Sequence, residues 1–151
     1  MTVEASPSKP KFPAAGELLP HGPAAVFLER VLERNSEDIC CEVVPGTRDA
    51  AYAEEGRIPA ELGIEYMAQA VAAYAGLREP VERRREIGYV IAVRNLQVLV
   101  PGFVLGEPLI VRAVWEWGEA NLARFSASIE RGGETLATAY LSVFRPQETT
   151  T

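Results

Sequence analysis

The sequence predicts an α+β domain in which one long, buried helix is wrapped by an antiparallel sheet. The first observation is a helix, running from about Ala60 to Leu77, that is apolar around most of its circumference, and such a helix is usually buried. The second is a change after this helix to segments that alternate at period two, as strands do. The third is that the gaps between these strands are too short for crossover helices, so the strands are expected to pair antiparallel.

The part of the chain before the helix predicts a leader, a strand and a loop. Residues 1–15 are rich in proline and small polar residues and are expected to form a flexible leader. A single domain then covers residues 16–147, followed by a disordered tail over residues 148–151. "AAVFLERVLERN" fits neither period cleanly and is left open as a strand or a helix. "SEDICCEVVPG" predicts a strand that ends at Pro-Gly, and "TRDAAYAEEGRIPAE" predicts a loop.

After the helix, the charged segment "REPVERRRE" predicts a link into four strands. These are "GYVIAVRNLQVLV", "EPLIVRAVWEW", "ARFSASIE" and "TLATAYLSVF", with turn regions at "PGFVLG" and "RGGE". Period-two spacing places Trp115 and Trp117 on one strand face with Val111 and Ala113. An apolar face of this kind indicates a dimer interface, and the alternative is that both tryptophans cap a core.

The composition argues against several classes of function. A net charge of −6 and a pI of about 4.9 argue against nucleic acid or a membrane as a partner. No apolar run reaches the roughly 20 residues of a membrane span and no secretory signal is present, so we expect a cytoplasmic protein. Cys40 and Cys41 are neighbours on a strand and point to opposite faces, which disfavours a disulfide, and a single histidine disfavours a metal site. No glycine-rich motif indicates a nucleotide or a flavin.

Glu65 is a carboxylate in the first turn of the apolar helix. The simplest interpretation is that it complements the positive end of the helix dipole. The alternative is functional, because apolar surroundings favour the protonated form of a carboxyl group and so suit it to acid or base chemistry near neutral pH. Gln69 lies four residues further on, on the same helix face, and is placed to form a hydrogen bond with Glu65.

Three segments in order resemble a known family. They are "LLPHGPAAVFLERVLE", "GRIPAELGIEYMAQAVAAYAGL" and "VPGFVLGEPLIVRAVW", and together they resemble the hot-dog-fold 3-hydroxyacyl-[acyl carrier protein] dehydratases of fatty acid synthesis. The most specific piece is "IEYMAQA", which in that family lies on the central helix. The ending "LSVFRP" and the short loop before the helix look closer to the dehydratase-like proteins of bacterial aryl polyene clusters. The resemblance implies a hot-dog fold, with a sheet curled around the central helix.

The resemblance also implies a site shared between two subunits. In the family, a histidine of one subunit removes the α-proton of a 3-hydroxyacyl thioester, and the glutamate at the position of Glu65 helps to expel the hydroxyl as water. A backbone N–H at the helix N-terminus, which falls on Ala60 after Pro59, holds the thioester carbonyl. Gly63, Gln69 and Arg57 complete the expected substrate-binding set.

The catalytic histidine of the family is missing from its usual place. The loop before the helix reads "EEGRIPAE", so the histidine is either replaced by Arg57 or deleted, and an arginine remains protonated and cannot act as the base. The one histidine, His21, is a structural turn residue, or it is recruited as the base. A third interpretation is that a different hot-dog protein supplies the histidine and this chain lends Glu65 to a heterodimer.

These observations predict a 3-hydroxyacyl-[acyl carrier protein] dehydratase, a lyase of fatty acyl or aryl polyene biosynthesis, working as a homodimer or heterodimer. The alternatives are a thioesterase of the same fold and a catalytically silent partner subunit. No cofactor is expected beyond the phosphopantetheine of the acyl carrier protein that carries the substrate. The expected docking site for the acidic carrier protein is a run of basic residues, which comprises Arg78, Arg83, Arg84 and Arg85. The alternative is that this run is a solvated loop whose positive charge is neutralised by neighbouring glutamates.

Overall fold

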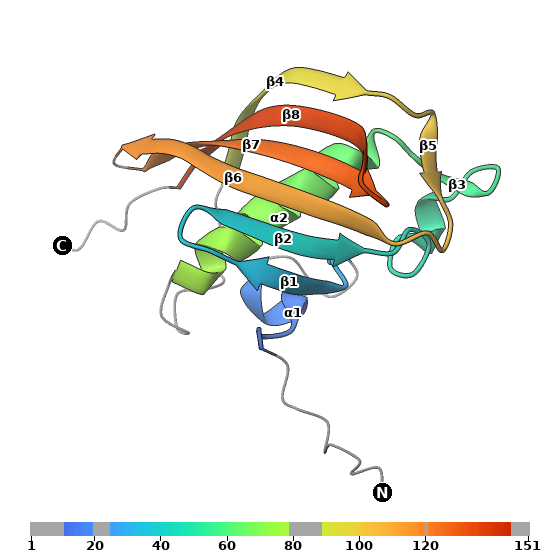
Figure 1. Cartoon of the computed structure of the whole chain (residues 1–151), viewed down its shortest axis with the longest axis horizontal. Helices are drawn as coiled ribbons and strands as arrows, with labels where there is room; N and C mark the ends of the chain where they lie inside the picture. The colour runs from blue at the N-terminus through green and yellow to red at the C-terminus, as the bar shows by residue number, and fades with distance from the viewer. Residues whose placement is uncertain (1–10, 20–24, 79–88, 120, 146–151) are drawn as a thin grey trace, which may run out of the picture.

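A six-stranded antiparallel sheet curls around one long helix, as the sequence predicts (Figure 1). The computed structural model describes residues 11–19, 25–78, 89–119 and 121–145, and the side chains of Arg78 and Tyr89 lie outside the description. The strand order in the main sheet is β1-β2-β6-β7-β8-β4. The strands are β1 (Arg30–Arg34), β2 (Asp38–Val43), β4 (Tyr89–Val98), β6 (Leu109–Glu119), β7 (Leu122–Arg131) and β8 (Glu134–Phe144).

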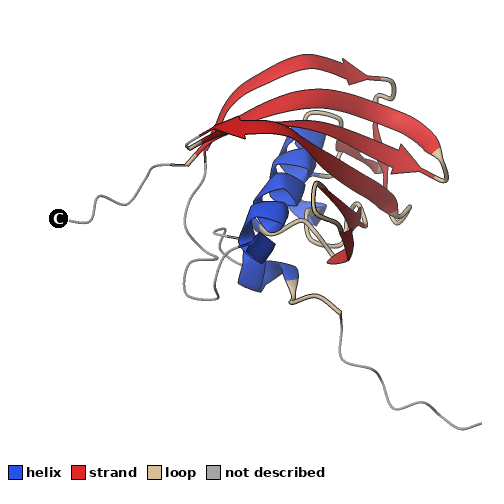
Figure 2. Ribbon diagram, turned by 60° about the vertical axis from the view of Figure 1, so that its left-hand side comes forward, coloured by secondary structure: helices blue, strands red, loops and turns tan. Residues whose placement is uncertain are grey.

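The central helix, α2 (Leu62–Arg78), lies against the concave face of the sheet, and Figure 2 shows the strands curving over it. Tyr66, Met67, Ala70 and Ala73 are fully buried, which agrees with the prediction of a buried helix. Small side chains on much of the helix surface let the strands approach closely. The hydrophobic core is the layer between α2 and the inward-facing residues of the strands.

The segment left open between strand and helix, "AAVFLERVLERN", contains no α-helix in its described part, residues 25–35. Val26, Phe27 and Leu28 are buried in the core, and the chain then enters β1, which pairs with β2. Cys41 of β2 faces the core and pairs with Val111, while Cys40 pairs with Arg112 on the other face. Both thiols are free.

Two short segments form a second sheet that the sequence analysis assigned to loop and turn regions. β3 (Arg57–Pro59) pairs antiparallel with β5 (Gly102–Val104), and Ile58 lies opposite Phe103. Figure 1 shows this pair at one end of the main sheet, next to the start of α2. Three residues are too short for a periodic signal, so only long-range pairing identifies them as strands.

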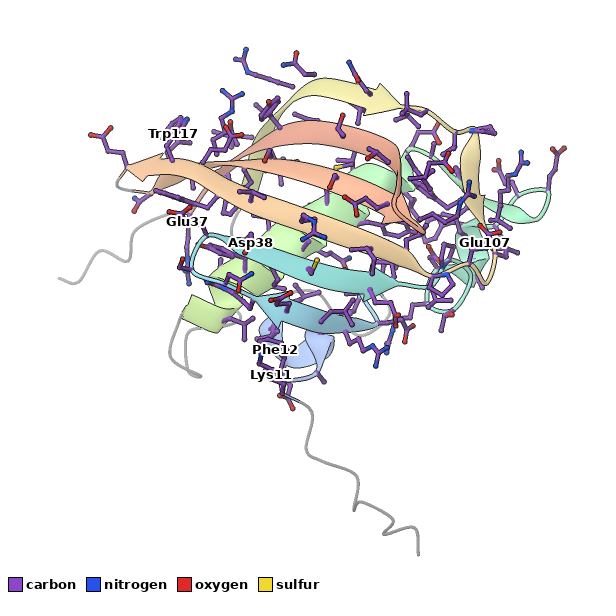
Figure 3. All side chains as sticks on the ribbon, in the orientation of Figure 1. Lys11, Phe12, Glu37, Asp38, Glu107 and Trp117 are labelled. Atoms are coloured by element: carbon purple, nitrogen blue, oxygen red, sulfur yellow. The ribbon has the colours of Figure 1, made fainter. Side chains whose placement is uncertain are left out.

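The prediction that Trp115 and Trp117 share one strand face is wrong. Trp115 pairs with Phe125, but Trp117 pairs with Arg124, the next residue of β7, because the register shifts between the two tryptophans. Such a β-bulge inserts one extra residue, here Glu116, and turns the following side chain to the opposite face. Trp115 packs against the core, whereas Trp117 is 44% exposed near the end of β6 (Figure 3).

At the N-terminal side, α1 (Ala15–Leu18) packs beside α2, with Ala15 and Leu18 in the core. The leader prediction for residues 1–15 falls largely on residues 1–10, and the predicted tail on residues 148–151; both ranges lie outside the described residues. The helices within the described ranges include none long and apolar enough to cross a membrane.

Candidate active site at the first turn of the central helix

Glu65 lies in the first turn of α2 and is half-buried. The turn that leads into the helix is closed by the Gly63 N–H, which donates to the Ala60 carbonyl at 2.9 Å. A carboxylate at this place lies near the positive end of the helix dipole. Glu65 is therefore both partly buried and close to the positive end of the helix dipole.

Gln69 binds Glu65 to the segment that precedes β1. Its Nε2 donates to Glu65 Oε1 at 3.0 Å and to the Ala25 carbonyl at 2.7 Å, while its Oε1 accepts from the N–H groups of Phe27 at 2.8 Å and Leu28 at 3.3 Å. The side chain is 0% exposed. The hydrogen bond from Gln69 to Glu65 is the one that the four-residue spacing predicts.

A second buried polar pair adjoins Glu65. The Tyr66 hydroxyl donates to Asp49 Oδ2, and the Gly46 N–H donates to Asp49 Oδ1 at 2.7 Å. Asp49 is 2% exposed and Tyr66 is fully buried. Burial raises the pKa of the Tyr66 hydroxyl, and the hydrogen bond to Asp49 and the negative charge of that carboxylate raise it further. The tyrosine therefore remains a hydrogen-bond donor throughout the physiological range.

Aromatic side chains surround this pair. The ring of Tyr66 lies between Phe27, with ring centroids 6.2 Å apart, and Phe103, with ring centroids 5.6 Å apart. Phe27 also meets Tyr52 edge to face at 5.9 Å, and Tyr52 is exposed. An apolar wall thus runs from the surface at Tyr52 to the core at Phe103, on the side of the helix that carries the second polar pair.

The structure brings only part of the predicted substrate-binding set together. Pro59 ends β3 and Ala60 follows it, both half-buried and just ahead of α2. Gly63 is enclosed rather than open, because a Cβ there would lie 3.1 Å from both Phe103 Cζ and Ile129 Cδ1. Arg57 starts β3 and is exposed. The closeness of Pro59 and Ala60 to Glu65 follows from the chain, whereas the packing of Gly63 is a tertiary feature.

Several predicted residues cannot be placed. His21 lies outside the described residues, as do Arg83, Arg84 and Arg85. Arg78 is the last residue of α2, and its side chain is not described. The roles given to these residues remain predictions.

Asp49 and Tyr66 were missed by the sequence analysis. Asp49 stands in a segment that predicts a loop, and Tyr66 is one of several aromatic residues on an apolar helix. Their pairing joins positions 17 residues apart and leaves no periodic signal. The one sequence feature that hints at this site is that Asp49 is a short polar residue between a Pro-Gly turn and a helix.

A hollow of about 340 Å³ lies away from Glu65, on the face of the sheet opposite to α2. Arg112, Ser128 and Tyr140 contribute to its lining, and the paired residues Arg112 and Ser128 alternate with inward-facing neighbours. This hollow therefore has no part in the candidate site. The described residues also contain no group of three or more His, Cys, Asp or Glu side chains placed to hold a metal ion.

Solved structures share this architecture. A chain of the dehydratase heterocomplex ApeI:P from Xenorhabdus doucetiae superposes with a TM-score of 0.83 at 24% identity, covering 92% of this chain and 95% of that one. The E. coli PaaI protein of the phenylacetic acid degradation operon gives 0.59 at 12% identity, covering 77% and 82%. Thioesterase superfamily member 2 from Mus musculus gives 0.58 at 14% identity, covering 76% and 79%. No curated protein sequence matches this one significantly.

The curled antiparallel sheet around a single long helix defines a protein of the hot-dog fold. The family model for ApeP-like proteins, described as ApeP dehydratase, matches residues 13–151. The chain therefore belongs to the ApeP-like dehydratase family, in agreement with the resemblance seen in the sequence.

Proposed function

We propose that this chain takes part in the dehydration of 3-hydroxyacyl thioesters carried on acyl carrier protein, in aryl polyene or fatty acyl biosynthesis. The family membership supports the reaction class. The observation that carries the proposal for the site is the hydrogen bond between Gln69 and Glu65, which holds a half-buried carboxyl group at the N-terminus of the central helix.

The reaction requires three groups. A base removes the proton from the carbon next to the thioester carbonyl, a hydrogen-bond donor stabilises the enolate-like oxygen, and an acid protonates the departing hydroxyl, which leaves as water. The product is the 2,3-unsaturated thioester. In the proposal Glu65 is the acid, and the backbone N–H of Ala60 is the donor. The base is a histidine, either His21 or a residue of a second hot-dog subunit.

The edge of the main sheet supports a two-subunit arrangement. β4 is the end strand of the sheet, and within the described residues it pairs with β8 alone. A strand with an unpaired edge and apolar side chains is a template for pairing with another chain. Six large apolar residues in or just after β4 are exposed, with Ile91 at 57% and Leu99 at 67%; the others are Val90, Val93, Leu96 and Val98. We propose that this β4 edge is covered by a second hot-dog chain.

A heteromeric partner accounts for the missing histidine. The structurally similar ApeI:P assembly is a dehydratase heterocomplex. By analogy, this chain would supply Glu65 while a partner with a histidine in the corresponding loop supplies the base. The docking of acyl carrier protein on the basic run of Arg78 and residues 83–85 is part of the same proposal.

The experiment is hydration of a short enoyl thioester, followed by loss of its absorbance, with the chain alone and with a histidine-bearing hot-dog dehydratase subunit from the same gene neighbourhood. Glu65→Gln preserves the shape of the side chain and removes the acid, so we expect a loss of about 10²–10⁴-fold in kcat. His21→Ala then separates the two sources of the base. Activity of the chain alone that is lost with His21→Ala identifies His21, and activity only with the partner identifies a heteromer. Wild-type rates in Glu65→Gln contradict the proposed role of Glu65.

A thioesterase is the second candidate, because thioesterase superfamily member 2 shares the fold. In that case Glu65 would orient a water molecule for attack on the thioester carbonyl, and the products would be a free acid and a thiol. Release of thiol from an acyl thioester, measured with a thiol reagent, separates this reaction from dehydration. A silent partner subunit would give neither product, and Glu65→Gln would then leave the rate of the complex unchanged.

A further inference from the structure

We propose that Asp49 and Tyr66 form a positioning pair that sets the first turn of α2 and therefore the place of Glu65. This inference rests on the proposed function of Glu65 as the acid. Tyr66 directly follows Glu65, and its hydroxyl donates to a carboxylate from the segment between β2 and β3. Neither residue is part of the reacting set described above.

Asp49 is held at both of its oxygens. Oδ2 accepts from Tyr66, and Oδ1 accepts from the Gly46 N–H at 2.7 Å. Gly46 has a φ of +90°, which favours glycine, and a Cβ there would lie 2.9 Å from Leu105 Cδ2. The turn at Gly46 is thus packed tightly, and the carboxylate has a fixed direction toward the helix.

The same turn is joined to the second sheet. The Gly106 N–H, in the loop between β5 and β6, donates to the Pro45 carbonyl at 2.9 Å. β5 pairs with β3, and β3 leads through Pro59 and Ala60 into α2. Asp49 therefore links α2 to the turn at Gly46, and that turn is joined through Pro45 and β5 to β3, the strand that leads to the Ala60 N–H proposed to donate to the thioester carbonyl.

Two buried polar anchors thus hold the first turns of the helix next to Glu65. Gln69 ties the helix to residues 25–28, and Tyr66 ties it to the turn at residues 46–49. Burying a carboxylate costs free energy that an apolar pair would not, and it is retained here with both oxygens satisfied. Polar pairs fix direction and distance more narrowly than apolar contacts do, and a misplacement of about 1 Å can cost 10²-fold in rate.

The same helix supplies a matched control. The Tyr74 hydroxyl donates to the Ser36 carbonyl at 2.6 Å, and Tyr74 is also buried. It lies eight residues after Tyr66, about 12 Å further along the helix, so it is far from Glu65. Tyr74→Phe removes a buried tyrosine hydroxyl from the same helix, there bonded to a backbone carbonyl and not to a carboxylate, and its effect measures the cost of losing such a hydroxyl for the fold alone.

The experiment compares Tyr66→Phe, Asp49→Asn, their double variant and Tyr74→Phe in the active form of the enzyme, well below the melting temperature of each. We expect kcat to fall tenfold or more in the first two variants with KM changed less than threefold, while Tyr74→Phe retains wild-type kcat at a comparable loss of melting temperature. The double variant should fall no further than the stronger single variant, because the two side chains act as one unit. Equal kcat in Tyr66→Phe and Tyr74→Phe overturns the proposal.

A second readout does not depend on turnover. The side-chain amide protons of Gln69 face Glu65 Oε1 and the Ala25 carbonyl, and their NMR signals and solvent exchange report the geometry at Glu65. We expect these signals to shift and to exchange faster in Tyr66→Phe but not in Tyr74→Phe. If Glu65→Gln retains wild-type rates while the Gln69 signals respond as stated, the proposed role of Glu65 fails and the positioning pair stands. Unchanged Gln69 signals in Tyr66→Phe overturn the pair itself.

Discussion

The Gln69 side chain can face Glu65 in only one way. Its Oε1 accepts from two backbone N–H groups, those of Phe27 and Leu28, so its Nε2 must point toward Glu65 Oε1, which it meets at 3.0 Å. Gln69 therefore holds Glu65 through Oε1 and, at the same time, holds the backbone of the segment before β1.

Replacing Gln69 by leucine tests this network. The substitution leaves the buried N–H groups of Phe27 and Leu28 without their side-chain partner. Each unsatisfied buried group costs about 1–3 kcal/mol, so we expect Gln69→Leu to lower the free energy of unfolding by about 3 kcal/mol. Urea unfolding measures the change. A loss below about 1 kcal/mol would show that the segment before β1 is held by its apolar contacts alone.

Gly63 is expected to tolerate alanine but not valine. An added Cβ lies at 3.1 Å from Phe103 Cζ and from Ile129 Cδ1, which a small shift of those side chains can relieve. In Gly63→Ala the higher helix propensity of alanine, about 1 kcal/mol, offsets this crowding. In Gly63→Val the larger side chain overpacks the core and costs about 1–3 kcal/mol. Melting temperatures measure both. Gly16→Ala is the control, because nothing lies within 4 Å of a Cβ at that exposed position.

Lysine substitutions on the β4 edge should block association without unfolding the chain. Ile91 and Leu96 are exposed in the single chain, so Ile91→Lys and Leu96→Lys should change the free energy of unfolding of the monomer by less than about 0.5 kcal/mol. Both introduce a charge into an interface that the proposed second chain would bury. Sedimentation analysis, alone and with the histidine-bearing partner, measures assembly. Leu32→Lys on β1, at the other end of the sheet, is the control; its assembly should be unchanged.

Stability should fall in alkaline solution as Cys41 titrates in the unfolded chain. Burial raises the pKa of the Cys41 thiol from 9.0 to about 12. Between these pH values the native thiol keeps its proton while the unfolded one loses it, so the native state binds more protons and unfolding becomes more favourable as pH rises. Cys41 then contributes a slope of up to about 1.4 kcal/mol per pH unit. In Cys41→Ala the decline of unfolding free energy from pH 9 to 10.5 should be shallower. Identical slopes contradict the assignment.

The periodic parts of the chain were predicted well, and for a physical reason. The buried helix and the strands β6, β7 and β8 are long enough for apolar residues to repeat at 3.6 or 2 residues, and the structure confirms them. The hydrogen bond between Glu65 and Gln69 is also local, since residues four apart on a helix lie on one face. These features are set by neighbours in the sequence.

The features that failed are those set by partners far away in the chain. A bulge at Glu116 turned Trp117 away from Trp115, because the register of β6 is decided by β7 and not by alternation within β6. The β3–β5 pair is too short to have a period. Gln69 was expected to contact Glu65, but its bonds to residues 25–28 span more than 40 positions and gave no signal.

The sequence by itself determined the α+β class, the central helix and the position of Glu65, because burial of an amphipathic or apolar segment follows from its own pattern. Only the tertiary structure decided that Gln69 ties the helix to residues 25–28, that Tyr66 pairs with Asp49 next to Glu65, and that β4 presents an apolar edge. A hydrogen bond between distant residues depends on how loops close and strands register. Those geometries belong to the folded chain as a whole, and no single stretch of residues encodes them.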